Sequence, residues 1–87
     1  MIDQTRTEPA PARITRAQQR AATRQAIIDA TIDCLVEDGY ATLTTRRVAD
    51  RVGIAQSTVM HHFETREALL VEAVSDLALR LANHFFR

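Results

Sequence analysis

The stretch VADRVGIAQSTVMHHF, residues 48–63, decides the fold of this 87-residue chain. Val48 and Val52 lie four residues apart, and so do Val59 and Phe63, so each pair can face the core from one short helix. The glycine between the two pairs can adopt a positive φ, which a tight turn between helices requires. Two short helices joined in this way predict a helix-turn-helix.

The second of these helices is expected to present short or planar hydrogen-bonding groups on its outer side. These groups are Gln56, Ser57, Thr58, His61 and His62. We expect no exposed aliphatic side chain among them. A DNA major groove is about 12 Å wide and accepts an α-helix, so this face is typical of a surface that contacts duplex DNA.

The adjacent histidines raise two other possibilities, a metal site and a catalytic pair. Neighbouring side chains on a helix diverge by about 100°, so His61 and His62 cannot chelate one ion. One turn away lie Ser57 and Thr65, which are poor zinc ligands, and Cys34 is distant in the chain. No serine or cysteine has a recognisable base and orienting group. We therefore expect that the protein is not an enzyme and that it binds no metal or cofactor. The two histidines are either DNA-facing side chains or solvated residues at a helix end.

Composition sets the broader class. With 46% hydrophobic residues and only two glycines and two prolines, the chain is typical of one small helical domain. No apolar run approaches 18 residues and no secretory h-region is present, which disfavours membrane spanning and secretion. The single cysteine, Cys34, fits a reducing compartment and is expected to be a small core residue. The sequence thus predicts a cytoplasmic protein, associated with the nucleoid if it binds DNA.

Charge is segregated although the net charge is zero. Residues 10–24 carry four arginines and no acid, whereas residues 25–40 carry four acids and no base. A neutral total can therefore hide a basic face. The four arginines either lie along DNA phosphates or form a solvated extension that aids solubility. They are Arg13, Arg16, Arg20 and Arg24.

The pattern outside the central stretch completes an all-α fold. A first helix starts near residue 17 and ends at Gly39, while Thr44 and Thr65 are expected helix N-caps. The first helix should bury Ile28, Thr31, Ile32 and Leu35, and the connection after it should be anchored by Tyr40 and Leu43. The last helix should carry an apolar stripe of Leu70, Val74, Leu77, Leu81 and Phe85, with Leu69 and Ala73 beside it. We expect this stripe to belong to the core first, and to an interface toward its end.

We therefore expect a three-helix bundle with a helix-turn-helix, followed by a fourth, connecting helix. Residues 1–16 would form a flexible arginine-containing tail and residues 17–66 the helix-turn-helix domain. Residues 67–87 would begin a helix that leads into a C-terminal domain absent from this chain.

Three segments carry a resemblance to a known family. They are TRQAIIDATIDCLVEDGY at 23–40, LTTRRVADRVGI at 43–54 and HHFETREALL at 61–70. Together they resemble, in one register without gaps, the DNA-binding domain of the TetR family of bacterial transcriptional regulators.

The resemblance implies roles for individual residues. Thr45 would contact the DNA backbone, and Arg46 would read a base edge or a phosphate. Gln56, Ser57 and Thr58 would read bases or phosphates. His61 would lie near the backbone. The resemblance assigns no role to His62, which the helix pattern alone places on the DNA-facing side. Arg66 would grip a phosphate in place of the family's usual lysine.

Two positions depart from the family pattern. Ala55 stands where a serine-like cap is common, which removes an N-cap worth about 1 kcal/mol. Met60 stands where a tyrosine usually donates its hydroxyl to a phosphate, so that contact is lost.

The function implied is sequence-specific binding of double-stranded DNA, as a repressor that occupies a pseudo-palindromic operator as a homodimer. Dimerisation, and binding of a small effector, would belong to the absent C-terminal domain. The alternative is a helical module that uses the same surface on another protein. Steep salt dependence distinguishes DNA binding from docking on a hydrophobic protein partner.

Overall fold

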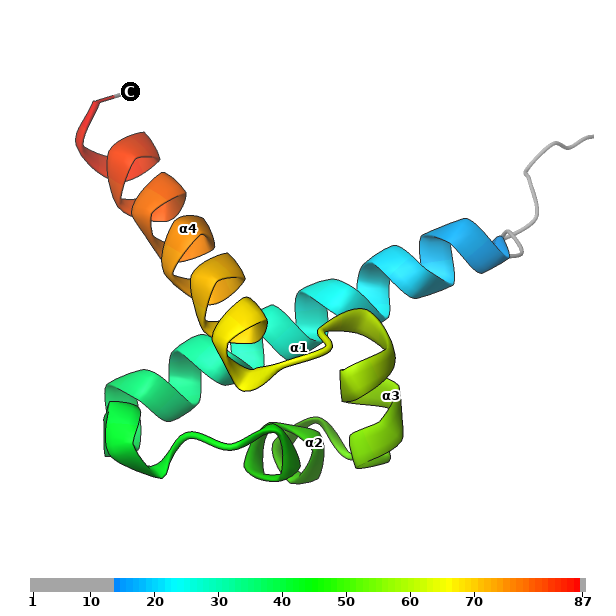
Figure 1. The fold of residues 1–87 in the computed structure, drawn as a ribbon. Coiled ribbons are helices and arrows are strands. Elements are labelled where there is room, and N and C mark those ends of the chain that lie inside the picture. The colour runs from blue at the N-terminus through cyan, green and yellow to red at the C-terminus, as the bar shows by residue number, and fades with distance from the viewer. Residues whose placement is uncertain (1–13, 87) are drawn as a thin grey trace, which may run out of the picture.

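The computed structural model describes residues 14–86, and this part of the chain is helical throughout, with no strand. Figure 1 shows α1 lying across the molecule, α2 and α3 together on one side of it, and α4 rising away from the bundle. The all-α fold class is therefore confirmed. The elements are α1 (Arg16–Asp38), the 3-10 helix η2 (Tyr40–Thr42), α2 (Thr45–Val52), α3 (Gln56–His62) and α4 (Arg66–Phe85).

A capping box sets the start of α1. The hydroxyl of Thr15 accepts a hydrogen bond from the backbone N–H of Gln18 at 3.0 Å. In return, the side-chain oxygen of Gln18 accepts from the N–H of Thr15 at 2.9 Å. The helix consequently begins at Arg16, one residue before the apolar pattern indicated, because a cap marks a helix end more sharply than periodicity does. Most of the expected tail, residues 1–13, lies outside the described residues.

The core draws at least one side chain from every α-helix and from the connection after α1. Ile27, Val48, Val59 and Leu69 are completely buried, and Leu43 is 1% exposed. The expected inward positions of α1 are confirmed, as are those of α3 and the burial of Cys34. These buried residues are Ile28, Thr31, Ile32, Cys34, Val59 and Phe63, with Leu35 partly buried against them.

The turn between α2 and α3 has the geometry that the glycine predicts. Gly53 has a φ of 86° in the left-handed region, and its N–H donates to the carbonyl of Ala49 at 2.8 Å. The N–H of Ile54 donates to the same carbonyl at 3.0 Å. The carbonyl of Ala49 thus accepts hydrogen bonds from two successive residues of the turn, which restrains the angle between the two helices locally.

The expected helix caps are confirmed. Thr44 accepts from the N–H of Arg47, and Thr65 accepts from the N–H of Ala68, each at 3.0 Å. Ala55 provides no side-chain cap to α3, as expected. This seven-residue helix therefore depends on packing against its neighbours for its stability.

The prediction for the inner face of α4 is wrong at Val74, which is 53% exposed, whereas Leu69 and Ala73 are completely buried. Leu81 and Phe85, at the end of the stripe that was expected to form an interface, are at least half exposed. The small Ala73 side chain allows α1 to approach closely, and α4 then leaves the bundle, as Figure 1 shows. Beyond this crossing the exposed large apolar side chains of α4 are Val74, Leu79, Leu81 and Phe85. Leu70 and Leu77, also in the predicted stripe, are partly buried against the core.

Ion pairs join the acidic half of α1 to α2 and α4. Arg51 of α2 donates two hydrogen bonds of 2.7 Å to the carboxylate of Glu37, which lowers the pKa of Glu37 and raises that of Arg51. Arg47 pairs with Asp38 in the same way. Arg80 of α4 pairs with an aspartate of each helix, Asp29 of α1 and Asp76 of its own. The acids of residues 25–40 thus hold α2 and α4 in place.

Candidate nucleic-acid interface

Helix α3 has one buried face and one open face. Val59 is completely buried and Phe63, which caps the helix, is 3% exposed. With about 100° between successive residues, Ser57 and His61 lie on the side opposite to these two anchors, with Met60 beside Ser57 and Thr58 beside His61. Ser57, Met60 and His61 are exposed, and so is Gln56 at the edge next to Met60. The open face of α3 is defined here by these four residues, Gln56, Ser57, Met60 and His61.

Thr58 and His62 are partly buried, unlike the other residues of α3 that were expected to face DNA. Met60 is 40% exposed on the open face, so the expectation of no exposed aliphatic side chain is wrong. An apolar thioether thus stands at the position where the family resemblance implies a tyrosine.

One edge of α3 is tied to the start of α2. The side-chain amide of Gln56 donates to the hydroxyl of Thr45 at 2.9 Å. Thr45 itself is 9% exposed, so its hydroxyl lies at the junction of the two helices rather than out on the surface. The amide oxygen of Gln56 stays available as an acceptor. This bond sets the position of Gln56 before any ligand arrives.

Arg46 follows Thr45 and differs from the other arginines of α2. Arg47 and Arg51 pair with acids of α1. Arg46 is exposed and makes no ion pair with any residue in the range 14–86. Of the three, it alone has a guanidinium that is not held by an acid of the described chain. Its neighbour in the chain, Thr45, is bonded to Gln56 at the edge of the open face.

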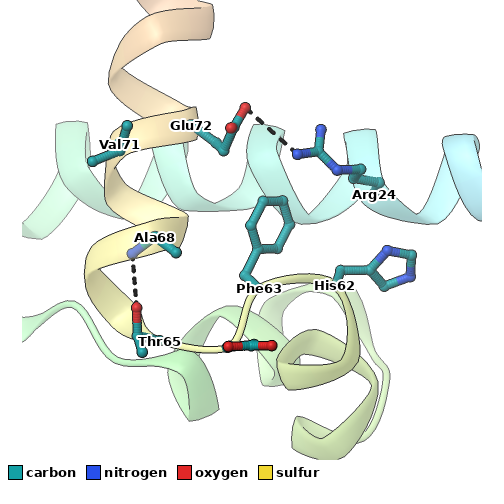
Figure 2. A pocket seen from close by; sticks show the side chains of 8 residues that line it. Arg24, His62, Phe63, Thr65, Ala68, Val71 and Glu72 are labelled. Carbon is teal, nitrogen blue, oxygen red and sulfur yellow. Dashed lines mark hydrogen bonds and ion pairs between the residues drawn. The ribbon is translucent and has the colours of Figure 1, made fainter.

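His62, at the other edge of α3, lies beside α1. Figure 2 shows His62 and Phe63 beneath α1, with Arg24 reaching over Phe63 toward Glu72. The guanidinium of Arg24 lies 4.8 Å from the Phe63 ring centroid and 3.5 Å from a Glu72 carboxylate oxygen. An open cleft lies between these side chains and the start of α4.

Burial lowers the pKa of His62, and the positive charges of Arg20, His61 and Arg24 lower it further. The two histidine rings are 6.1 Å apart and perpendicular to each other. His61 and His62 thus differ in surroundings: His61 is exposed on the open face, whereas His62 lies half-buried beside the arginines of α1. Among residues 14–86, no group of three or more His, Cys, Asp or Glu side chains could hold a metal ion.

Arg66 has partners that the sequence did not indicate. Its Nε donates to the carbonyl of Leu43 at 2.6 Å, and its two terminal nitrogens donate to the carbonyl and the hydroxyl of Tyr40, at 2.7 and 3.0 Å. The Tyr40 ring is 55% exposed, so it is not the apolar anchor expected. The sequence around Tyr40 and Leu43 gives no indication that Arg66, 26 residues after Tyr40, stacks on the tyrosine ring.

Comparison with known proteins agrees with this geometry. The sequence model of the family described as bacterial regulatory proteins, tetR family, matches residues 27–73, more than half of the chain. A search for helices that could cross a membrane found none within the described residues. No solved structure gives a significant match.

Several curated relatives are similar over the same region. An HTH-type transcriptional repressor of Mycobacterium tuberculosis is 32% identical over 62 residues, which is 71% of this chain and 33% of the relative. An HTH-type transcriptional regulator of Mycobacterium bovis is 34% identical over 74 residues, 85% of this chain and 35% of the relative. The class D tetracycline repressor protein of Escherichia coli is 43% identical over 47 residues, 54% of this chain and 22% of that protein.

The chain thus spans about a third or less of the length of these curated relatives. The matched region runs from the middle of α1, through α2 and α3, into the first half of α4, and so contains the whole helix-turn-helix. This chain belongs to the TetR family of bacterial transcriptional regulators, a non-enzymatic family, and carries its helix-turn-helix DNA-binding domain.

Proposed function

We propose that this protein binds duplex DNA sequence-specifically and represses transcription by occupying a pseudo-palindromic operator as a homodimer. The observation that carries the proposal is the open face of α3. Val59 and Phe63 anchor this helix in the core, and the Gln56–Thr45 hydrogen bond fixes its first turn. What is left outside is Ser57, Met60 and His61, on a helix that fits a major groove about 12 Å wide.

The side chains have different tasks in this proposal. Gln56, Ser57 and His61 face the bases and the neighbouring backbone, because they lie on the open face. Arg46 has a free, planar guanidinium at the edge of that face, which suits a bidentate contact to guanine or to a phosphate. Met60 adds an apolar surface that suits a thymine methyl group.

The remaining proposed residues act from the rim. Thr58 and His62 flank the open face and reach DNA only along its edge, so we assign them backbone contacts. Thr45 acts mainly by positioning Gln56. Arg66 stays a proposed phosphate contact through whatever donor capacity its bonds to Tyr40 and Leu43 leave, since a guanidinium has five N–H donors.

The dimer belongs to the proposal because one open face of this size covers only half of a two-fold site. The relatives are about three times longer than the matched region, and Val74, Leu81 and Phe85 of α4 are exposed apolar side chains. We infer that a C-terminal helical domain following α4 covers them and forms the dimer. A small-molecule effector would bind in that domain. The proposal places the protein in the bacterial cytoplasm, on the chromosome.

Repression is preferred over activation because two of the similar proteins are named as repressors. An operator-bound protein that blocks polymerase needs no further contact surface, so repression is also the simpler mechanism.

Selection from a random duplex pool tests the proposal directly. The chain is immobilised, duplexes are selected at low salt and the bound fraction is sequenced over several rounds. With the wild-type chain we expect enrichment of a short motif. With the Arg46→Ala variant we expect the same motif with a weaker base preference at one position. The Arg47→Ala variant is the matched control, because this arginine pairs with Asp38 instead of facing the groove. A pool that stays random with the wild-type chain would rule the function out.

A further inference from the structure

Three arginines of α1 share one side of the helix. Arg16, Arg20 and Arg24 follow one another at intervals of four residues, which places successive side chains only about 40° apart. We call this set the α1 arginine stripe. No acidic residue occurs between residue 14 and Asp29, so nothing within this half of α1 neutralises it.

The stripe is largely unpaired. Arg16 and Arg20 are exposed and make no ion pair with any residue in the described range, and Arg24 keeps 44% of its side chain exposed beside Glu72. By contrast, Arg47, Arg51 and Arg80 all pair with acids. The unpaired arginines among residues 14–86 are therefore Arg16, Arg20 and Arg46.

Two of these arginines, Arg46 and Arg20, lie toward opposite edges of the open face of α3, and Arg16 lies one turn of α1 before Arg20. Gln56 marks the edge bonded to Thr45, next to Arg46. On the helical wheel His62 lies about 120° from Gln56 across the buried side, at the far edge of the open face. His62 lies close enough to Arg20 and Arg24 for their charges to act on its ring. The Arg24–Phe63 stacking contact fixes α1 to the end of α3 at this edge.

We propose that the α1 arginine stripe is a second DNA contact, which binds the phosphates of the sugar-phosphate backbone on the side of the major groove opposite to Arg46. A major groove is bordered by two backbones, and a helix lying in it meets phosphates at both edges. Arg46 serves one edge, and the stripe serves the other. The inference rests on the proposed function, because it requires α3 to lie in the groove.

Phosphate contacts of this kind are independent of base sequence, and the dependence of the binding constant K on salt concentration measures their number. Each contact makes the negative slope of log K against log salt steeper by about 0.9, so losing one contact makes the slope less steep by that amount. Its loss therefore weakens binding about eightfold more at 0.1 M salt than at 1 M. We expect Arg20→Gln to reduce the slope by about one, and Arg16→Gln with Arg20→Gln by about two. The loss should be equal for the selected duplex and for a scrambled duplex.

The experiment is fluorescence anisotropy with the full chain, at a series of salt concentrations, on both duplexes. Arg20→Lys should keep the wild-type slope, because the charge is retained. Ala22→Glu is the matched control: it changes the net charge by one unit, as Arg20→Gln does, but Ala22 lies about 200° around the helix from Arg20. Circular dichroism of each variant checks that α1 is intact.

The outcomes separate the two proposals. A wild-type slope in the double arginine variant, or an equal loss in Ala22→Glu, would overturn the stripe while leaving the function of α3 in place. A loss confined to the selected duplex would also overturn it, because the stripe would then read bases. Absence of duplex binding by the wild-type chain would overturn the proposed function and the stripe together.

Discussion

The guanidinium of Arg66 lies 4.3 Å from the centroid of the Tyr40 ring and also bonds the Tyr40 carbonyl and hydroxyl. A single side chain thereby joins the first residue of α4 to η2, 26 residues earlier. Its third bond, to the carbonyl of Leu43, holds the residue that precedes the Thr44 cap of α2. The position of α2 relative to α4 therefore depends on this arginine.

Replacement of Arg66 tests whether it is a phosphate contact or an internal anchor. We expect Arg66→Ala to lower the free energy of unfolding by about 1–3 kcal/mol, because two backbone carbonyls and the stacked ring lose their partner. Thermal denaturation measures this. The phosphate contact proposed for its remaining donor capacity should appear separately, as a slope of log K against log salt that is less steep by up to about one. A lowered melting temperature with an unchanged slope would show that Arg66 is an internal anchor only.

Tyr40→Phe is the control for Arg66. It removes only the 3.0 Å bond to the hydroxyl and keeps the ring beneath the guanidinium. Its effect on stability should be less than half that of Arg66→Ala.

Arg46→Ala should weaken binding to the selected duplex by about 1–3 kcal/mol and blur the preference at one base pair. The melting temperature should not change, since Arg46 pairs with no described residue. Arg47→Ala should leave the base preference intact and cost at most about 1 kcal/mol of stability, because its ion pair with Asp38 is exposed. Competition binding with single-base variants of the duplex measures both. A base preference altered by Arg47→Ala alone would reverse these roles.

His62 should make the fold, rather than the complex, sensitive to acid. Its pKa is lowered by burial and by Arg20, so the unfolded chain binds more protons than the folded one between the lowered value and about 6.5. The free energy of unfolding therefore rises with pH across this window and falls as pH drops through it. Urea titrations at several pH values should show a weaker dependence in His62→Gln. An equal dependence in that variant would assign the effect to other groups.

The C-terminal half of α4 should require a partner. Leu79, Leu81, Phe85 and Phe86 are between 50% and 85% exposed, an apolar patch that a solvated helix end does not favour. We expect the 87-residue chain to self-associate, or to fray beyond about Leu77. Sedimentation velocity and amide exchange measure the two possibilities. A monomer with exchange protection through Phe86 would contradict both.

Local signals predicted most of the fold. Thr44, Thr65 and Gly53 each act through the backbone within a few residues of themselves, so their positions in the sequence are enough to place the helix ends. The alternation of buried and exposed residues in α1 follows from the helical period in the same way.

Tertiary geometry decided the rest. Val74 has the right spacing for a core residue, but the crossing angle of α4 on α1 selects Leu69 and Ala73 instead, and that angle is not visible in the period. The same limit applies to the site. Ser57 and His61 could be assigned to the open face from the sequence, whereas the partners of Arg66 depend on segments that meet only in three dimensions.

The anchoring of α3 has a consequence for how this protein can change over generations. Ser57, Met60 and His61 contribute nothing to the core, while Val59 and Phe63, on the opposite side of the helix, contribute to it fully. If the open face reads DNA as proposed, substitutions on it alter what is recognised at little cost to folding, since exposed positions away from caps and cores usually change stability by less than about 0.5 kcal/mol. A gene duplicate can thus acquire a new target site by drift at three codons, without first passing through an unfolded intermediate.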